Sequence, residues 1–214
     1  MNLSSYIDHT LLKPTCTVDE IASLCSEAAE YGFAAVCVPP PFVKRVKVIL
    51  APVEVKIATV VGFPFGYAAT EAKLAETVLA LVDGADEIDM VINLVALRMD
   101  DWDYLQKEVK LLAGVVHQKG KIIKVIIESG ILTEEEIIKC CNTIGSEGID
   151  FMKTSTGYAE KGASIEAVRL MRKHLPADVK IKASGGIRNY EFAKALVEAG
   201  ADRLGCSASV AIVG

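Results

Sequence analysis

Two lysines stand at the ends of short apolar runs, where an isolated charge is costly to bury. Lys153 lies in "FMKTSTGY" (151–158) and Lys182 lies in "KIKASGGIR" (180–188). Each lysine is followed closely by a glycine-containing turn. The repeated arrangement predicts a site that brings two amines together.

Two neighbouring amines favour the loss of a proton from one of them. At about 4 to 6 Å and an effective dielectric constant near 20, two ammonium groups repel each other by roughly 3 to 4 kcal/mol. This repulsion lowers the pKa of one amine toward neutrality, so we expect that deep burial of the amine is not required. The free amine can attack a carbonyl and form a Schiff base, whose iminium withdraws electrons from a neighbouring carbon–carbon bond.

Breaking or making that bond also requires a proton shuttle, for which a carboxylate is suited. Asp89 in "DEIDMVI" (86–92) is the candidate, and the chemistry needs neither a cofactor nor a metal. A purely structural interpretation stays open, in which the lysines belong to a buried layer of ion pairs. Two lysines near strand ends favour the catalytic interpretation.

The elements that would position these residues alternate along the chain. Helical patterns separate apolar runs of strand length, and this alternation indicates a parallel sheet. In the segment 100–120, for example, Trp102, Leu105 and Val109 fall on one helical face, and Gly120 is expected to cap that helix. The predicted strands are 6–11, 33–38, 54–62, 86–92, 121–128, 150–155, 179–184 and 203–207.

A recurrent glycine precedes several of these strands and marks a repeated αβ unit. Gly32, Gly84, Gly148 and Gly200 each stand where a helix would end and the next strand begin. Eight strands favour a single-domain (β/α)8 TIM barrel over residues 1–214. A doubly wound open sheet is the alternative, but no GxGxxG motif follows the first strands.

Strand periodicity predicts which side chains face the barrel axis. Ile88, Met90 and Ile92 form an apolar face that suits the covering helices, which turns Asp89 inward. The same alternation turns Lys182 inward. Glycine-rich turns after the last three strands, "STG" (155–157), "SGGI" (184–187) and "GCSAS" (205–209), could bind a phosphate through backbone N–H groups.

Composition narrows the range of partners and compartments. The net charge of −5, with acidic and basic residues mixed along the chain, argues against nucleic acid as a partner. The six cysteines form no CxxC pair, and no segment has the length and apolar character of a membrane span. The N-terminus lacks the pattern of a signal peptide. We therefore expect a cytoplasmic protein that binds neither nucleic acid nor a membrane.

Motifs along nearly the whole chain resemble the 2-deoxy-D-ribose-5-phosphate aldolases, a family of class I Schiff-base aldolases. The matching segments are "IDHTLLKPT", "AAVCVPPPFV", "ATVVGFPFGY", "GADEIDMVIN", "KVIIESG", "FMKTSTGY", "KASGGIR" and "RLGCS". The resemblance implies a cofactor-independent enzyme that joins acetaldehyde to glyceraldehyde 3-phosphate. Members of the family are often dimers, so it also implies a homodimer or higher homo-oligomer.

The resemblance also implies roles for individual residues. Lys153 would form the Schiff base, Lys182 and Asp89 would exchange protons, and Asp8 would pair with Lys182. Thr156 would contact a sugar hydroxyl, and the phosphate-binding positions would be Gly157, Gly185, Gly186 and Ser207. Two other functions stay open: a Schiff-base lyase acting on a different aldehyde or sugar phosphate, and a barrel that binds a phosphorylated ligand without turnover.

Overall fold

The computed structural model describes residues 1–214 and contains a closed barrel of eight parallel strands. Neighbouring strands along the chain pair with each other, and β1 (Ile7–Thr10) pairs with β8 (Arg203–Cys206) to close the ring. The remaining strands are β2 (Ala35–Val38), β3 (Lys56–Val61), β4 (Glu87–Val91), β5 (Ile122–Ile126), β6 (Phe151–Lys153) and β7 (Lys180–Ser184). Closure confirms the predicted TIM barrel and excludes the open sheet. Each strand lies within its predicted run.

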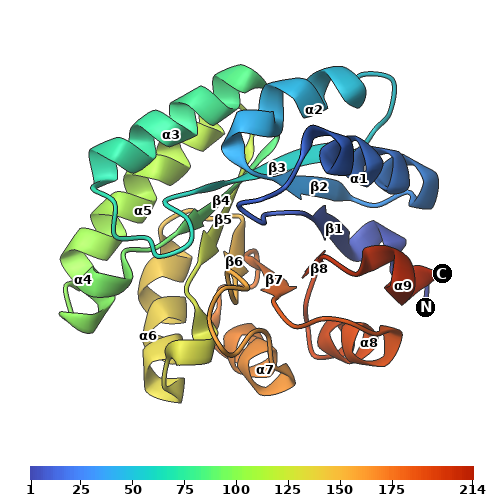
Figure 1. The fold of residues 1–214 in the computed structure, drawn as a ribbon. Helices are drawn as coiled ribbons and strands as arrows, with labels where there is room; N and C mark the ends of the chain where they lie inside the picture. Colours follow the sequence, from blue (N-terminus) through green and yellow to red (C-terminus); the bar gives the residue numbers. More distant parts are fainter.

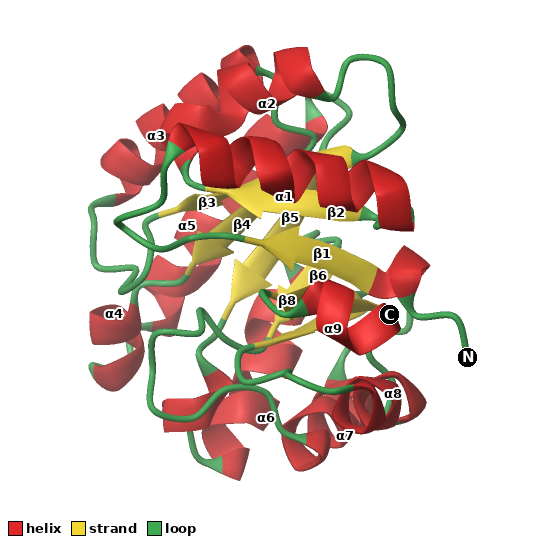
Figure 2. Ribbon diagram, turned by 45° about the vertical axis from the view of Figure 1, so that its right-hand side comes forward, coloured by secondary structure: helices red, strands yellow, loops and turns green.

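Helices surround the ring of strands, as Figures 1 and 2 show. They are α1 (Val18–Tyr31), α2 (Val43–Ile49), α3 (Thr70–Asp83), α4 (Leu94–Arg98), α5 (Trp102–His117), α6 (Glu134–Thr143), α7 (Ile165–His174), α8 (Tyr190–Glu198) and α9 (Ser209–Val213). Four short 3-10 turns complete the set: η1 (Ser4–Tyr6), η2 (Pro40–Phe42), η3 (Ser129–Ile131) and η4 (Ile144–Ser146). None of these helices combines the length and apolar character needed to cross a membrane.

Local signals in the sequence explain several helix ends. Thr17 begins α1 with a capping box in which its side chain accepts the N–H of Glu20. Gly32 ends the same helix in the left-handed conformation, as predicted. The prediction for Gly120 was wrong in position: Gln118 caps α5, and Gly120 takes its positive φ of 63° two residues later.

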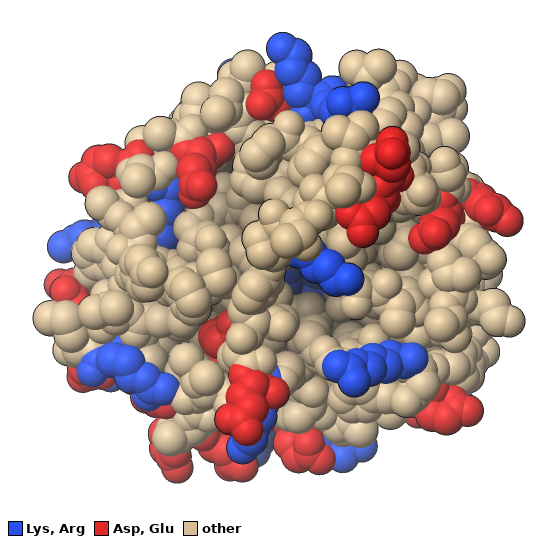
Figure 3. All heavy atoms as spheres, viewed as in Figure 1, with Lys and Arg blue, Asp and Glu red and all other residues tan.

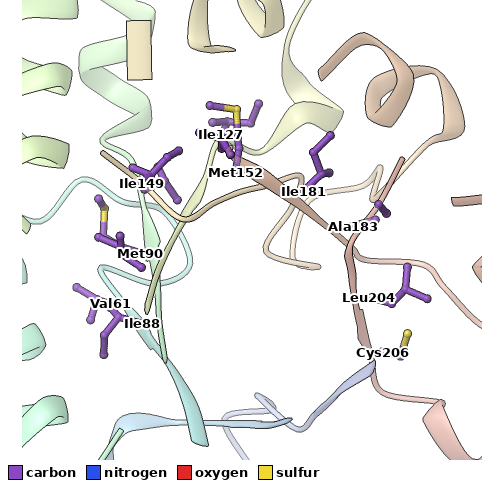
Figure 4. Close-up of a cluster of buried hydrophobic side chains, with 14 of the residues drawn as sticks. Val61, Ile88, Met90, Ile127, Ile149, Met152, Ile181, Ala183, Leu204 and Cys206 are labelled. Atoms are coloured by element: carbon purple, nitrogen blue, oxygen red, sulfur yellow. The ribbon is translucent and has the colours of Figure 1, made fainter. Parts of the chain in front are cut away.

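The main apolar core lies between the strands and the helices. It contains 49 buried residues. Figure 4 shows some of them, including Ile88, Met90 and Leu204, on the outer side of the strands. This placement confirms the predicted helix-facing side of β4. A smaller apolar cluster of Cys37, Ala58 and Val60 belongs to β2 and β3. These residues alternate with core residues on their strands, which places them on the inner side of the barrel.

A buried ion pair joins two helices outside the barrel. Lys73 of α3 and Glu108 of α5 are both fully buried, and the Lys73 Nζ lies 2.9 Å from Glu108 Oε2. The amine also donates to the carbonyl of Val91 at 2.8 Å, at the end of β4. Burial of these two charges is tolerated because each is the main electrostatic partner of the other.

We expect Lys73→Met to lower the free energy of unfolding by about 3 to 5 kcal/mol, because it leaves the Glu108 carboxylate buried without its cation. Equilibrium urea denaturation measures the loss. Lys194→Met is the matched control, since Lys194 pairs with Glu198 at an exposed (i, i+4) position and should cost less than about 1 kcal/mol. The double variant Lys73→Met/Glu108→Leu should recover most of the loss. Equal stabilities for Lys73→Met and Lys194→Met would contradict the prediction.

Candidate active site

Seven charged side chains from six strands meet inside the barrel, beside the small apolar cluster of β2 and β3. The acidic members are Asp8, Glu87 and Asp89, and the basic members are Lys124, Lys153, Lys182 and Arg203. We call this set the barrel charge cluster. The strand register assembles it: Asp89 is the partner of Lys124 across β4 and β5, and Lys153 is the partner of Lys182 across β6 and β7.

Asp89 is the centre of the barrel charge cluster. Its Oδ2 accepts hydrogen bonds from the Nζ atoms of Lys153 and Lys182, each at 2.7 Å. Its Oδ1 accepts from Lys124 Nζ, also at 2.7 Å. Burial alone would raise the pKa of Asp89, but the three lysines hold that pKa well below its usual value. The carboxylate is therefore ionised at neutral pH.

Lys153 carries the amine that is easiest to deprotonate in the barrel charge cluster. Its pKa is lowered mainly by burial, with a further lowering from the positive charge of Lys182, while Asp89 opposes both. Because Lys153 and Lys182 share one oxygen of Asp89, their nitrogens can be no farther apart than twice 2.7 Å. The expected proximity of the two amines is confirmed. Burial, which the sequence did not predict to be required, is the largest cause of the shift.

Lys182 keeps its proton. Burial would lower its pKa, but Asp8 and Asp89 outweigh burial and raise that pKa. Its Nζ lies 2.5 Å from Asp8 Oδ2, which confirms the predicted pairing. Gly205 of β8 leaves room for the lysine, because a Cβ there would lie 3.2 Å from Lys182 Cε.

Two basic members of the cluster, Lys124 and Arg203, were not predicted from the sequence. Lys124 contacts Glu87 at 2.5 Å and Asp89 at 2.7 Å, and these carboxylates help to raise its pKa against the effect of burial. Arg203 contacts Asp8 at 2.6 Å. Alternation in "KIIKVIIE" (121–128) could have identified Lys124, because it separates Lys124 from the outward-facing Ile123 and Val125.

The balance of charges favours a neutral Lys153. With every group ionised, the barrel charge cluster has four cations and three carboxylates. Among the lysines, Lys153 alone has a lowered pKa, whereas the pKa values of Lys124 and Lys182 are raised, so Lys153 is the easiest of the three to deprotonate. Loss of its proton leaves three cations facing three carboxylates. A cluster without net charge is the least costly arrangement in an environment that excludes water.

A pocket opens above Lys153 and gives a ligand access to its amine. It has a volume of about 460 Å³. Figure 3 shows a hollow near the middle of the face viewed in Figure 1, with basic side chains beside it. The lining residues are Thr10, Leu11, Leu12, Lys13, Pro14, Lys153, Thr156, Gly157, Tyr158, Ser184, Gly185, Gly186, Ile187, Arg188, Gly205 and Ser207.

The structure therefore brings together every residue singled out from the sequence, but in two layers. Lys153 and the predicted substrate-binding residues Thr156, Gly157, Gly185, Gly186 and Ser207 line the pocket. Asp8, Asp89 and Lys182 lie beneath it, in the barrel charge cluster and fully buried. Only Lys153 belongs to both layers.

Backbone geometry explains the glycines on one wall of the pocket. Gly157, Gly185 and Gly186 all have positive φ values, between 78° and 88°. Gly185 also packs against the backbone of Gly162, where an added Cβ would lie 2.2 Å from the Gly185 oxygen. These turns leave backbone N–H groups without side chains above them, which suits an anionic ligand.

Two further residues that line the pocket and one residue behind it were not singled out from the sequence. Lys13 and Arg188 line the pocket and supply positive charge at its wall. Glu128, which follows β5, is buried and accepts hydrogen bonds from the backbone and side chain of Thr156. Glu128 could have been identified from the sequence, because it is a charged residue at the end of the apolar run 121–128.

Comparison with known proteins identifies the family. The model of the DeoC/LacD family aldolases matches residues 3–211. The chain belongs to this family. It is 51% identical to the deoxyribose-phosphate aldolase of Thermococcus gammatolerans, covering 100% of this chain and 96% of that protein. It is 50% identical to the deoxyribose-phosphate aldolase of Caldanaerobacter subterraneus, covering 100% of this chain and 93% of that protein.

Solved structures of the family share the barrel. The deoxyribose phosphate aldolase of Aeropyrum pernix, described as a unique tetrameric structure, is 32% identical with a TM-score of 0.93, and the match covers 99% of this chain and 89% of that one. Another structure, described as an aldolase, is 40% identical with a TM-score of 0.93 and covers 100% of this chain and 95% of that one.

We expect Lys182→Leu to raise the pKa of Lys153, because the substitution removes a positive neighbour that disfavours the protonated amine. Competitive labelling with trace acetic anhydride, followed by peptide mass spectrometry, measures the titration of Lys153 directly. Lys180→Leu is the matched control, since Lys180 lies on the same strand but is exposed. A Lys153 midpoint that is unchanged or lower in Lys182→Leu would contradict the electrostatic account.

Proposed function

We propose that this chain is a class I aldolase that reversibly cleaves 2-deoxy-D-ribose 5-phosphate to D-glyceraldehyde 3-phosphate and acetaldehyde. Full-length relatives named deoxyribose-phosphate aldolase support this substrate. The observation that carries the chemistry is the contrast among the three buried lysines of the barrel. Lys153 alone of these lysines lines the pocket, and it alone has a lowered pKa.

The proposed reaction begins with addition of the Lys153 amine to the aldehyde carbon of the open-chain sugar phosphate. Loss of water gives an iminium. Removal of the proton from the hydroxyl on carbon 3 then breaks the bond between carbons 2 and 3, and the electron pair moves into an enamine. D-Glyceraldehyde 3-phosphate leaves, carbon 2 of the enamine takes up a proton, and water releases acetaldehyde from the amine.

We assign the proton transfers to Asp89 and Lys182. Asp89 is an ionised carboxylate 2.7 Å from the reacting amine, which suits a group that accepts a proton and returns it. Lys182 is a protonated donor bonded to the same carboxylate oxygen. Asp8 then serves to hold Lys182 and its charge in place through a second ion pair.

The rest of the pocket is assigned to the phosphorylated end of the substrate. Gly157, Gly185, Gly186 and Ser207 would bind the phosphate through backbone N–H groups and a hydroxyl, and Thr156 would contact a sugar hydroxyl.

The proposed reaction needs no cofactor or metal. Residues 1–214 would act as one aldolase domain without nucleic acid or membrane partners. A cytoplasmic location is supported by six cysteines that are all unpaired.

A borohydride trap tests the chemistry and the residue together. Reduction in the presence of acetaldehyde should fix a two-carbon adduct on Lys153, which peptide mass spectrometry locates. Incubation with 2-deoxy-D-ribose 5-phosphate should release both acetaldehyde and D-glyceraldehyde 3-phosphate, and Lys153→Ala should abolish the release. Lys180→Ala is the control and should be trapped normally on Lys153.

Each outcome separates one alternative. An unmodified Lys153 would favour a barrel that binds phosphorylated ligands without turnover. An adduct on Lys153 without cleavage of the sugar phosphate would favour a Schiff-base lyase with a different substrate.

We also propose that the chain forms a homo-oligomer through an apolar face on α3. The exposed side chains of this face are Val78 at 45%, Leu79 at 61% and Val82 at 75%, and Val82 follows the other two by four and three residues, on the same side of the helix. Apolar side chains clustered on one face mark an interaction surface. The tetrameric relative from Aeropyrum pernix supports a second copy of the chain as the occupant.

Light scattering after size-exclusion chromatography should give a mass at least twice that of one chain, 22.9 kDa. Leu79→Asp should lower that mass, because it places a charge in the interface. Val18→Asp is the control, since Val18 is an exposed valine of α1 and lies outside the proposed face. A wild-type protein with the mass of one chain would contradict the assembly.

A further inference from the structure

Glu128 follows β5 in a backbone conformation that is uncommon for residues other than glycine. Its φ and ψ are 55° and 56°, and its side chain is buried. A non-glycine residue keeps this left-handed conformation only where surrounding contacts fix it, and such residues cluster at functional sites.

The contacts of the Glu128 carboxylate all lead to Thr156. Its oxygens accept the backbone N–H of Thr156 at 3.3 and 3.2 Å, and Oε2 also accepts the Thr156 hydroxyl. Burial raises the pKa of Glu128, while these hydrogen bonds and the charge of Lys153 oppose the rise. Glu128 thus lies behind a pocket residue and does not line the pocket itself.

These contacts determine what the Thr156 hydroxyl can offer to a ligand. The hydroxyl has one proton, which it donates to Glu128, and it accepts the backbone N–H of Tyr158 at 3.1 Å. One lone pair remains available. Thr156 lines the pocket together with Lys153. A ligand group that meets this oxygen must therefore be a hydrogen-bond donor.

The chemistry of the cleavage identifies the matching group, provided that the proposed function holds. The hydroxyl on carbon 3 becomes a carbonyl during the reaction and loses its proton. The hydroxyl on carbon 4 remains a donor in the substrate, in the transition state and in D-glyceraldehyde 3-phosphate. A fixed hydrogen-bond acceptor is therefore compatible with the hydroxyl on carbon 4 at every stage of the reaction.

We propose that Glu128 is a positioning residue that fixes Thr156 as an acceptor for the hydroxyl next to the carbonyl of the three-carbon aldehyde. It thereby makes the enzyme select aldehydes that carry this hydroxyl. A carboxylate is required for this role, because an amide at the same place would donate to the Thr156 oxygen and turn its proton toward the ligand.

Glu128→Gln tests the proposal, since it keeps the side-chain shape and an oxygen for the Thr156 N–H. The assay joins acetaldehyde to D-glyceraldehyde or to 3-hydroxypropanal, which lacks the hydroxyl next to the carbonyl. The ratio of kcat/KM for D-glyceraldehyde over 3-hydroxypropanal should fall about tenfold, the effect of one hydrogen bond. The kcat/KM for 3-hydroxypropanal should stay close to the wild-type value.

Thr156→Val provides a second test that does not depend on the folding of the Glu128 variant. It should lower the same ratio by a similar factor, and Glu128→Gln should add nothing in the Thr156→Val background. Glu108→Gln is the matched control, because it removes another buried carboxylate outside the barrel and should leave the ratio unchanged.

Equal losses for both aldehydes in Glu128→Gln would overturn the proposal and give Glu128 a purely structural role. An unchanged ratio in Thr156→Val would also overturn it. Failure of the proposed function would be recognised separately, since the wild-type protein would then join neither aldehyde to acetaldehyde.

Discussion

The site depends on one electrostatic constraint: the charges inside the barrel must balance without water. Asp89 accepts hydrogen bonds from three lysines, and the seven charged side chains of the barrel charge cluster, Asp89 included, contain one cation more than carboxylates when all are ionised. Loss of one proton would remove this excess, and Lys153 is the lysine of the cluster whose pKa is lowered. Burial contributes most to this result, because desolvation disfavours the charged form, and the neighbouring Lys182 adds to it.

Strand register is what keeps this balance in place. Lys153 and Lys182 are direct partners across β6 and β7, and Asp89 and Lys124 are direct partners across β4 and β5. A slip of one residue in any of these strands would turn its charged side chain toward the helices and its apolar side chains toward the barrel axis. The large apolar core on the outer side of the strands specifies the register, and it therefore keeps the charged side chains inside the barrel.

The pocket and the barrel charge cluster have different roles. The cluster lies beneath the pocket on rigid strands and controls protonation. The pocket is built mainly from the turns that follow the strands, where glycines with positive φ expose the backbone and Glu128 orients Thr156. Under the proposed function, changes in the turns would alter which aldehyde is accepted while the amine of Lys153 keeps its environment.

The sequence by itself determined the architecture and the identity of the central residues. Alternating apolar runs and helical segments predicted all eight strands, and strand parity turned Asp89 and Lys182 inward, because these patterns are local and follow fixed periods. Only the tertiary structure decided the electrostatics. Lys124, Arg203 and Glu128 come from strands or turns that are distant along the chain, and desolvation of Lys153 depends on everything packed around it. A pKa set by burial is a property of the closed barrel, and no local pattern encodes it.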